Sequence, residues 1–444
     1  SLPLVAAKDI GSVLLDVEFP PAPSEVMALL RDRSFDTVMF VVNGFTNDPR
    51  VVKTASAVTG FGRRLLAIGL QANDGPLTYT LKSLDDGTPL ILVPNMNRPI
   101  NIAMRARKLP TAARAPRHEL WLACMGLCVG SILEQIPSKP GLVLHSHDYH
   151  GMLVGGVALA KCGRRRDFWW IHDAHEFIRQ YDIIDPGLQA AGAAWEEMFI
   201  RDVDHMCTVS EELAARLQEA YDLPRLPSVI YNTNLLSSRY KYRGESVKAK
   251  MGLTGKYLMV HSGTVTKGRG VENAIVALPR FPNAVLLLIT ESKNATTDKI
   301  EKLALQLGVA DRVLYHPFLP HDEVVGFIAD VDLGLITPDR YGNADVGLAN
   351  KLFDYIPAGV PVVSSDTDAM RRFMTEWPIG EVFEAGNAES LSKAIASVMA
   401  NPERYKQAIN SRIDFILKVT WEEQIARLYR IYDELTSPQP SADE

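Results

Sequence analysis

Short apolar runs alternate with amphipathic stretches along most of the chain. In the first half, the runs that have strand length cover residues 36–43, 65–70, 89–94, 141–147, 167–173, 206–210 and 227–232. Stretches of helical length separate them, among them residues 120–133 and 211–220. Continuous apolar strands that alternate with helices are typical of a parallel sheet covered on both faces. The pattern therefore predicts an α/β domain.

A second α/β series follows residues 233–250, which have little apolar character and are interpreted as a linker. Its apolar runs cover residues 257–263, 284–290, 312–317, 331–338 and 360–365, and a helical region closes the chain after residue 401. The expected fold class is α/β, with two Rossmann-like doubly wound parallel-sheet domains facing each other across a cleft. The predicted N-terminal domain covers residues 1–233 and includes an appended segment, residues 1–33. The predicted C-terminal domain covers residues 234–420. Residues 421–444 are expected to form a closing helix that returns to the N-terminal domain and ends in a polar tail.

Composition is that of an ordinary globular protein and excludes some classes of function. The 444 residues are 47% hydrophobic and 23% charged, and the net charge of −6 predicts no global attraction to nucleic acid. Four cysteines show neither a disulfide framework nor the CxxC spacing of a zinc site. The longest apolar run, residues 120–133, is shorter than the roughly 20 residues that span a bilayer, and the first residues lack the pattern of a secretion signal. We expect a cytoplasmic protein.

The stretch 340–366 carries the first candidate site. Two apolar runs enclose a short predicted helix, residues 350–356, and so form a βαβ unit. The loop before such a helix lies at the carboxyl edge of a parallel sheet, where backbone N–H groups favour a phosphate. Asn350 and Lys351 begin this helix and Asp354 follows, so a cation for phosphate and a carboxylate for ribose would suit a nucleotide-sugar. An ordinary exposed Lys and Asp on a surface helix are the alternative.

A loop containing glycines is the second candidate for phosphate binding. Its sequence, HSGTVTKGRG, spans residues 261–270 and includes Lys267. Gly263 opens a GxxxxG spacing, but Arg269 and Gly270 follow where a P-loop has Lys and then Ser or Thr, so an NTPase is not expected. The loop also lacks the GxGxxG pattern of dehydrogenases. A glycine turn with solvated basic side chains is the alternative.

Titratable side chains are concentrated at the ends of two strands of the first domain. The stretches HSHD (residues 145–148) and HDAHE (residues 172–176) lie there, followed in the first case by His150. Together they contain five of the ten histidines, and the candidates are His145, His147, Asp148, His150, His172, His175 and Glu176. Because parallel strands end at one edge of a sheet, we expect these side chains to converge. A histidine can orient a sugar hydroxyl, stabilise developing positive charge or transfer a proton near neutral pH. A zinc or iron site is the alternative for the cluster, and His145 and His150 are interpreted as packing residues.

Taken together, these motifs resemble the GT-B fold retaining glycosyltransferases of family four, the group 1 glycosyltransferases, over roughly residues 36–432. The first-domain matches are a DPRV-type loop, an HD pair at a strand end, a following strand-end histidine, and VSEEL-type and YN elements, at residues 48–51, 147–148, 172, 210–213 and 231–232. The second-domain matches are a glycine loop that ends in a basic residue and Gly, and a KLFEY-like element followed by AGVPVV, with Gly263, Arg269, Gly270 and Asp354 at the functional positions.

The resemblance implies an enzyme that transfers a sugar from a nucleoside-diphosphate-sugar donor to an acceptor hydroxyl with retention of the anomeric configuration. It places the reaction in polysaccharide, glycolipid or glycoside biosynthesis, with no cofactor and no essential metal. The implied donor-binding residues are Gly263, Lys267, Arg269, Gly270, Asn350, Lys351 and Asp354. The implied catalytic residues are His172 and Asp148, and the implied acceptor or sugar side comprises Asn43, Arg50, His147, His175, Glu176 and Asp345.

Two positions depart from the family pattern. Thr264 stands where the family often has Arg, so Lys267 would supply that charge for the phosphates. Val346 stands where an acid is usual, beside Asp345. A non-catalytic nucleotide-sugar-binding protein is therefore one alternative. A nucleotide-sugar epimerase on the same fold is another, and it would need an acidic pair that the sequence does not show clearly.

A basic stretch of the first domain bears on the acceptor. Residues 87–118 contain no acidic residue and six basic ones, Arg98, Arg105, Arg107, Lys108, Arg114 and Arg117. A basic face could dock on anionic lipid and present the site to a glycolipid, which would place the protein peripherally on the inner face of the membrane. A solvated loop, with a soluble sugar or small molecule as the acceptor, is the other interpretation. No nucleic-acid partner is expected.

Overall fold

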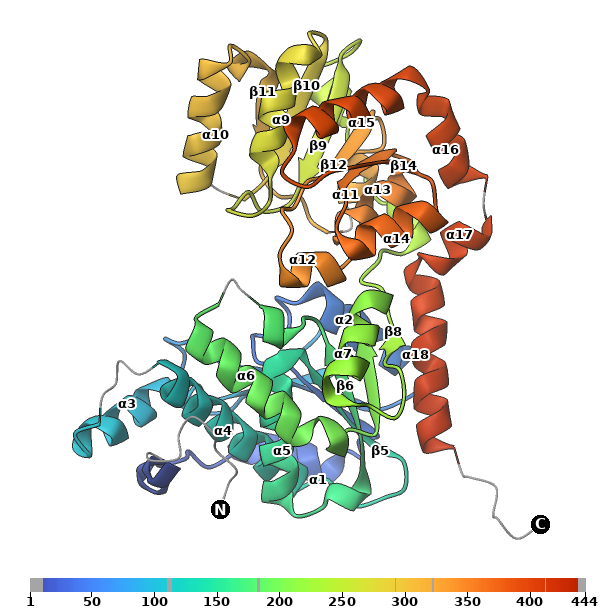
Figure 1. Cartoon of the computed structure of the whole chain (residues 1–444). Coiled ribbons are helices and arrows are strands. Elements are labelled where there is room, and N and C mark those ends of the chain that lie inside the picture. Colours follow the sequence, from blue (N-terminus) through green and yellow to red (C-terminus); the bar gives the residue numbers. More distant parts are fainter. Residues whose placement is uncertain are drawn as a thin grey trace. The chain divides into compact units, whose positions relative to one another are not determined.

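The chain forms two α/β units (Figure 1), and the computed structural model describes residues 11–109, 114–181, 184–291, 293–321, 323–411 and 413–437. The first unit comprises the chain up to Val209, residues 213–230 and the end from Ile425, and the second comprises Ser210–Glu212 and Tyr231–Gln424. These unit bounds differ from the predicted division at residue 233, because residues 210–212 and residues from 231 on belong to the second unit. Within that unit Glu211 pairs with Arg372 at 2.7 Å, and the Tyr231 N–H donates to Gln424 Oε1 at 3.0 Å. The predicted polar tail from residue 438 lies outside the described residues.

The first unit is built on an eight-stranded sheet with the order β3-β4-β2-β1-β5-β6-β7-β8. Neighbouring strands are parallel except for β3 and β4, which are antiparallel. The strands are β1 (Thr37–Phe40), β2 (Leu65–Leu70), β3 (Thr80–Ser83), β4 (Pro89–Val93), β5 (Leu142–His147), β6 (Phe168–Ala174), β7 (His205–Thr208) and β8 (Ser228–Val229). The helices are α1 (Ser24–Asp32), α2 (Pro49–Gly60), α3 (Asn97–Ala106), α4 (Arg114–Leu133), α5 (Asp148–Cys162), α6 (Pro186–Phe199), α7 (Glu211–Tyr221) and α18 (Trp421–Thr436), which enters this unit at Ile425.

The described part of the N-terminal segment belongs to the core of the first unit. A 3-10 helix, Gly11–Asp16, precedes α1, and Val13 and Val17 are 0% and 6% exposed. Both side chains pack in one buried cluster with residues of α3 and α4. The expectation of an appended segment over residues 1–33 is therefore corrected for residues 11–33, because Val13 and Val17 pack against these two helices and Val26 and Leu30 of α1 are also buried.

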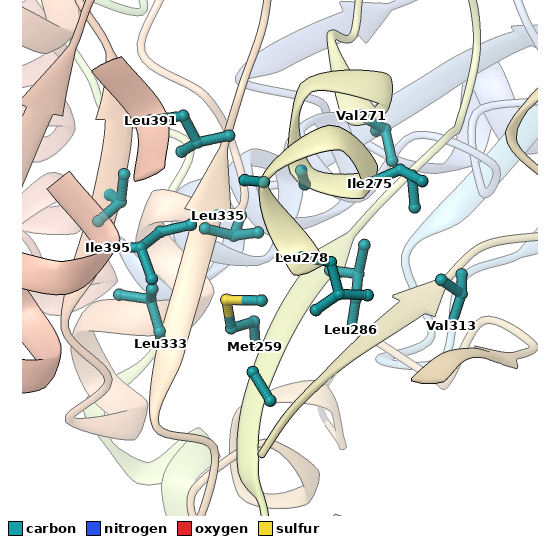
Figure 2. Close-up of a cluster of buried hydrophobic side chains, with 14 of the residues drawn as sticks. Met259, Val271, Ile275, Leu278, Leu286, Val313, Leu333, Leu335, Leu391 and Ile395 are labelled. Atoms are coloured by element: carbon teal, nitrogen blue, oxygen red, sulfur yellow. The ribbon is translucent and has the colours of Figure 1, made fainter. Parts of the chain in front are cut away.

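The second unit is built on a six-stranded parallel sheet with the order β11-β10-β9-β12-β13-β14. Its strands are β9 (Tyr257–Ser262), β10 (Ala284–Ile289), β11 (Val313–His316), β12 (Leu333–Ile336), β13 (Val362–Ser365) and β14 (Gly380–Phe383). Its helices are α8 (Val247–Lys250), α9 (Val271–Ala277), α10 (Ala295–Gln306), α11 (Val324–Phe327), α12 (Gly342–Val346), α13 (Leu352–Ala358), α14 (Asp368–Glu376), α15 (Ala388–Ala400), α16 (Pro402–Asn410) and α17 (Ile413–Lys418). Figure 2 shows part of its core, where Met259 and Leu286 of the sheet meet Ile275 of α9 and Ile395 of α15.

Two edge strands and one packed segment depart from the sequence-based expectations. β3 and β14 lie at sheet edges and are largely half-buried or exposed, so they lack the apolar run that identified the central strands. The segment 233–250 was expected to be a linker, and this was wrong. Thr233, Asn234 and Val247 are 1%, 5% and 0% exposed. The Asn234 side chain also donates to the Phe353 carbonyl at 3.2 Å, which ties this segment to α13.

Each sheet has one point at which its strand order reverses. In the first unit this point lies between β1 and β5, and in the second it lies between β9 and β12. Doubly wound sheets bind ligands in the crevice outside the carboxyl ends of the strands at this point, because the helices that follow the two strands pack on opposite faces. The candidate residues of both units follow these strands or their immediate neighbours.

Candidate functional site

The glycine loop of the second unit is held against the end of β12. Gly263 and Gly270 have φ angles of 127° and 61°, which favour glycine. A Cβ on Gly270 would lie only 2.0 Å from the Thr337 carbonyl oxygen, so this position has no room for a side chain. The Thr337 hydroxyl donates to the Arg269 carbonyl at 2.8 Å and fixes the end of the loop. The loop therefore lies at the point where the strand order reverses.

A half-buried lysine faces this loop. Lys351 precedes α13, and its Nζ lies 3.0 Å from His261 Nε2 and 3.7 Å from where a Cβ of Gly263 would be. Burial, with the Arg269 guanidinium nearby, lowers the pKa of Lys351 to about 7. Burial and Lys351 also hold the pKa of His261 well below its usual value, so that imidazole is neutral. Two cationic side chains thus share a loop that an anion would stabilise.

The other predicted donor-binding residues occupy different environments. The expected helix over residues 350–356 begins two residues later, at α13, so Asn350 precedes the helix and is exposed. Asn350 Oδ1 accepts from Asn232 at 3.3 Å, and Asp354 Oδ1 accepts from Asn234 at 2.7 Å. Lys267 is exposed. The structure therefore brings Gly263, Arg269 and Lys351 together, and the half-buried Lys351 is better placed than the exposed Lys267 to supply charge that Thr264 cannot.

The acidic position beside Val346 also has a defined partner. Asp345 lies in α12 of the second unit and pairs with Arg340 at 3.1 Å. Arg340 also pairs with Asp368 at 2.7 Å. Val346 is 1% exposed, and its carbonyl accepts a hydrogen bond from the Ser210 hydroxyl. Asp345 is thus part of a charge network within its own unit.

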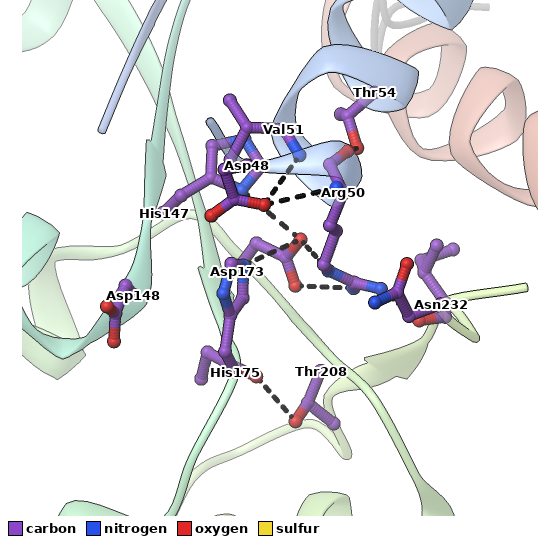
Figure 3. Close-up of polar contacts among 12 residues, drawn as sticks. Asp48, Arg50, Val51, Thr54, His147, Asp148, Asp173, His175, Thr208 and Asn232 are labelled. Carbon is purple, nitrogen blue, oxygen red and sulfur yellow. Dashed lines mark hydrogen bonds and ion pairs between the residues drawn. The ribbon is translucent and has the colours of Figure 1, made fainter. Parts of the chain in front are cut away.

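A buried ion pair organises the strand ends of the first unit (Figure 3). Asp48 accepts from the backbone N–H groups of Arg50 and Val51 at 3.1 and 3.2 Å, and so caps α2. The Arg50 guanidinium donates twice to Asp173 on β6, both times at 2.8 Å, and once to the Ile230 carbonyl at 2.8 Å. Because Arg50 is 3% exposed and makes these three contacts, we assign it a positioning role for Asp173.

Asp173 sets the charge of two neighbouring histidines. Its Oδ2 lies 3.4 Å from His147 Nδ1 and 3.7 Å from His175 Nε2. Burial opposes ionisation of Asp173, but Arg50 holds the pKa of its carboxyl well below the usual range. Burial would lower the pKa of His175, yet Asp173 raises it to about 9, whereas burial dominates at His147 and lowers its pKa. His175 is therefore a cation at neutral pH and His147 is not.

The hydrogen bonds around His172 indicate one tautomer. Its Nδ1 lies 2.8 Å from the Ser146 hydroxyl, and that oxygen already accepts from Trp170 Nε1 at 2.8 Å. The hydroxyl proton has two acceptors within reach, His172 Nδ1 at 2.8 Å and the Ile171 carbonyl at 3.4 Å, and the shorter contact assigns it to His172 Nδ1, which leaves the ring proton on Nε2. Burial lowers the pKa of His172 to about 3. His172 Nε2 is buried and has no hydrogen-bond partner among the described residues, so the neutral ring keeps one N–H donor for a ligand.

Two carboxyl groups next to the histidines have pKa values that are shifted in opposite directions. Burial and the Asp148 carboxylate raise the pKa of Glu176 to about 8. Burial is outweighed at Asp148, where His150 and His175 lower the pKa. Asp148 also has a φ of 65°, an uncommon angle for a non-glycine residue, at the point where β5 turns into α5. At neutral pH Asp148 is thus the charged acceptor and Glu176 carries a proton.

The cluster fits a metal ion poorly. His145, His147 and Asp173 place potential ligand atoms within 4.8 Å of one another. However, both Asp173 oxygens accept from Arg50, whose positive charge would oppose a cation. His145 Nδ1 lies 2.8 Å from the Tyr432 hydroxyl, in line with the packing role expected for His145. His150, the other expected packing residue, has its Nε2 3.0 Å from His118 Nε2.

Sequence reasoning located the strand ends but missed central residues. Asp173 was inside the HDAHE stretch, but nothing in the sequence showed that Arg50 would bond to it. His261 lay within the loop sequence, and its contact with Lys351 depends on the fold. Asn43 was expected on the acceptor side. Its Oδ1 accepts from the Phe45 N–H at 2.7 Å and so shapes the loop after β1.

The basic stretch of the first unit is not a uniform charged face. Arg107 pairs with Asp16, and its Nη1 donates to Ser12 at 2.8 Å. Arg114 and Arg117 instead line a cavity of the first unit. Within the ranges that the structure describes, no helix is both long and apolar enough to cross a membrane.

Two family models match the chain. Residues 245–431 match the model described as Glycosyl transferases group 1, and residues 90–233 match the model described as Glycosyltransferase Family 4. The matches do not overlap, and they include the glycine loop, Lys351 and the histidine cluster.

Individual relatives are distant in sequence. The lipopolysaccharide core biosynthesis glycosyltransferase LpsE of Rhizobium meliloti is 26% identical over 144 residues, which are 32% of this chain and 40% of that protein. Sucrose-phosphate synthase from Thermosynechococcus elongatus superimposes with a TM-score of 0.68 at 14% identity, over 90% of this chain and 98% of that one. Anabaena HepE in complex with UDP and glucose has a TM-score of 0.65 at 12% identity, over 90% of this chain and 100% of that one. These likenesses confirm the expected fold class.

The buried pair predicts a large loss of stability when only one partner is removed. We expect Arg50→Met to lower the free energy of unfolding by about 3–5 kcal/mol, because Asp173 would remain buried without its partner. The double variant Arg50→Met/Asp173→Asn should regain most of this loss. Chemical denaturation measures both.

A matched control is Arg64→Met, which breaks a pair with Asp36 in which the Arg64 side chain is 61% exposed. That change should cost less than about 1 kcal/mol. Equal losses for the buried and the exposed arginine would contradict a dependence of the first unit on the Arg50–Asp173 pair.

Proposed function

Because the chain belongs to the group 1 glycosyltransferases, we propose that it transfers a sugar from a nucleoside-diphosphate-sugar donor to an acceptor hydroxyl with retention of the anomeric configuration. The observation that carries the proposal is the half-buried Lys351, held beside the glycine loop and Arg269 in the unit that matches the group 1 family model. HepE, whose fold is similar, has been solved with UDP and glucose, which supports a nucleotide-sugar as the donor.

The second unit would bind the diphosphate. Lys351 and Arg269 would each make a charge-assisted hydrogen bond to its oxygens, and the backbone at Gly263 allows close approach because no Cβ intervenes. Negative charge grows on the leaving diphosphate as the bond to the anomeric carbon breaks. Fixed cations at this position would stabilise that charge more in the transition state than in the bound donor, which is the condition for catalysis.

The first unit would supply groups to the sugar and the acceptor. His172 is neutral and its Nδ1 already accepts a hydrogen bond, so it would donate from Nε2 to a hydroxyl and would not remove a proton. The charged Asp148 would accept a hydrogen bond from a hydroxyl. In the reaction the acceptor oxygen would bond to the anomeric carbon on the face that the diphosphate leaves, and the acceptor proton would pass to a leaving phosphate oxygen. These groups would bind and orient, and the two phosphate-binding cations would carry the electrostatic stabilisation.

Donor turnover tests the proposal directly. After exhaustive EDTA treatment, we expect the protein to release nucleoside diphosphate from one of a panel of UDP-, GDP-, ADP- and TDP-sugars, because side-chain cations serve where many nucleotide sites use magnesium. Proton NMR of the new sugar would show the donor's anomeric configuration. Activity that disappears with EDTA and returns with a divalent ion would refute metal independence, and no turnover of any donor would support a binding protein instead.

Removing Arg269 should weaken donor binding without unfolding the protein. For Arg269→Ala we expect the affinity for UDP to fall by about 1.5–3 kcal/mol, or roughly 10- to 150-fold, as for the loss of a charge-assisted hydrogen bond. Calorimetric titration measures the affinity. The control Arg280→Ala removes a surface arginine of the same unit that pairs with Glu389 and should leave UDP binding unchanged. Similar affinities for wild type and Arg269→Ala would remove Arg269 from the phosphate site.

The lowered pKa of Lys351 predicts that UDP binding takes up a proton. The free lysine has a pKa of about 7, and a bound diphosphate would raise it, so only below pH 7 is the amine charged before binding. UDP affinity should therefore fall as pH rises above 7, by up to about tenfold per unit. Calorimetry in buffers of different ionisation enthalpy would detect the proton. Lys351→Met should bind more weakly and take up none, and a constant affinity in the wild type from pH 6.5 to 8.5 would contradict this role.

A further inference from the structure

The first unit contains a cavity of about 480 Å³ that the histidine cluster does not use. Its walls come from the loops after β1, β2 and β4 and from the first turns of α4, with Asn43, Gln71 and Asn95 representing the three loops. These strands are parallel neighbours, so their carboxyl ends meet at one edge of the sheet. The volume lies within the ~300–1,000 Å³ that is usual for small-molecule sites.

Side-chain amides line one wall of the cavity in a fixed arrangement. Asn95 Nδ2 and Asn97 Nδ2 both donate to Asn73 Oδ1, at 3.1 and 3.0 Å. Trp121 Nε1 donates to Asn95 Oδ1 at 3.0 Å, and this contact determines which end of the Asn95 amide is oxygen. The bonds leave the Asn73 amino group and Asn97 Oδ1 for a ligand. A wall that offers both donors and acceptors suits adjacent hydroxyl groups, which also donate and accept.

Two arginines give the cavity a positive charge. Arg114 and Arg117 lie in the first turn of α4, and neither has a carboxylate partner within the described part of the chain. Some other arginines of this unit are paired, as Arg165 is with Asp204 at 2.9 Å. His118 also lines the cavity, but burial lowers its pKa to about 3, so it adds no charge. Among the described lining residues there is no acid to neutralise the two guanidinium groups.

We infer that this cavity binds an acceptor that is a polyhydroxylated ring carrying an oxyanion, such as a phosphorylated sugar or a sugar acid. The amide wall would bind the hydroxyl groups and the two arginines would bind the phosphate or carboxylate. The role of this ligand as an acceptor rests on the proposed function, but its binding to the cavity does not depend on donor turnover. It also assigns Arg114 and Arg117, two residues of the basic stretch, to the binding of a small molecule.

Binding of small sugars to the full chain without a donor tests the inference. Ligand-observed NMR titrations would compare glucose 6-phosphate, glucuronate, glucose and inorganic phosphate. We expect at least one of the two anionic sugars to bind at least tenfold more tightly than either glucose or inorganic phosphate, and the better one identifies phosphate or carboxylate as the oxyanion. If neither anionic sugar binds, or if glucose binds equally well, the inference is overturned.

Variants locate the binding in the cavity. Arg114→Ala/Arg117→Ala should lower the affinity for the preferred anionic sugar at least tenfold. Arg98→Ala, which removes an exposed arginine of α3 outside the cavity, should change nothing. Asn73→Ala should lower the affinity for the anionic sugar and leave the weak affinity for inorganic phosphate unchanged. Unchanged sugar affinity in the double arginine variant would place the site elsewhere.

The same samples separate this inference from the proposed function. UDP binding reports on the second unit and should be identical in wild type and in the double arginine variant. A wild-type protein that binds an anionic sugar but no nucleoside diphosphate would sink the proposed function alone. A protein that binds UDP and turns over a donor but takes up no anionic sugar would sink the cavity assignment alone.

Discussion

The Arg50–Asp173 pair is the interaction on which the functional end of the first unit depends. It joins the start of α2, which follows the loop after β1, to β6. The third Arg50 contact reaches Ile230, which directly follows β8. A charge as buried as that of Asp173 persists only beside a fixed counter-charge. Through Asp173 the pair makes His175 cationic. Arg50 and His175 then place two positive charges beside the carboxylates of Asp173 and Asp148 at the crowded strand ends.

Most of the fold followed from the pattern of apolar residues, since buried parallel strands must be apolar on both faces. Of the fourteen strands that the structure describes, twelve overlap predicted apolar runs and two do not. The edge strands β3 and β14 are covered on fewer sides and carry mixed side chains, so no periodicity marks them. The segment 233–250 was wrongly predicted to be a linker for a related reason. Its burial depends on a few residues such as Thr233 and Val247, whose spacing follows neither a strand nor a helix.

Positions in the sites were more predictable than their chemistry. Residues at strand ends must gather at one edge of the sheet, so His172 and Lys351 could be identified as candidates from the sequence. The tautomer of His172 depends on Ser146 and Trp170, and the charge of Lys351 depends on His261 and the proximity of Arg269. Such partners are chosen by the tertiary fold. The amide-lined cavity had no motif at all, because its residues come one or two at a time from separate loops.

His172 and Lys351 differ in how they respond to acidity. His172 keeps a single neutral form across the physiological range, since burial holds its pKa at about 3. Lys351, with a pKa of about 7, changes its charge within that range. A pH–rate profile for this protein would therefore carry spatial information. An inflection near pH 7 would originate at Lys351 beside the glycine loop and one near pH 8 at Glu176 of the first unit, whereas His172 would contribute none.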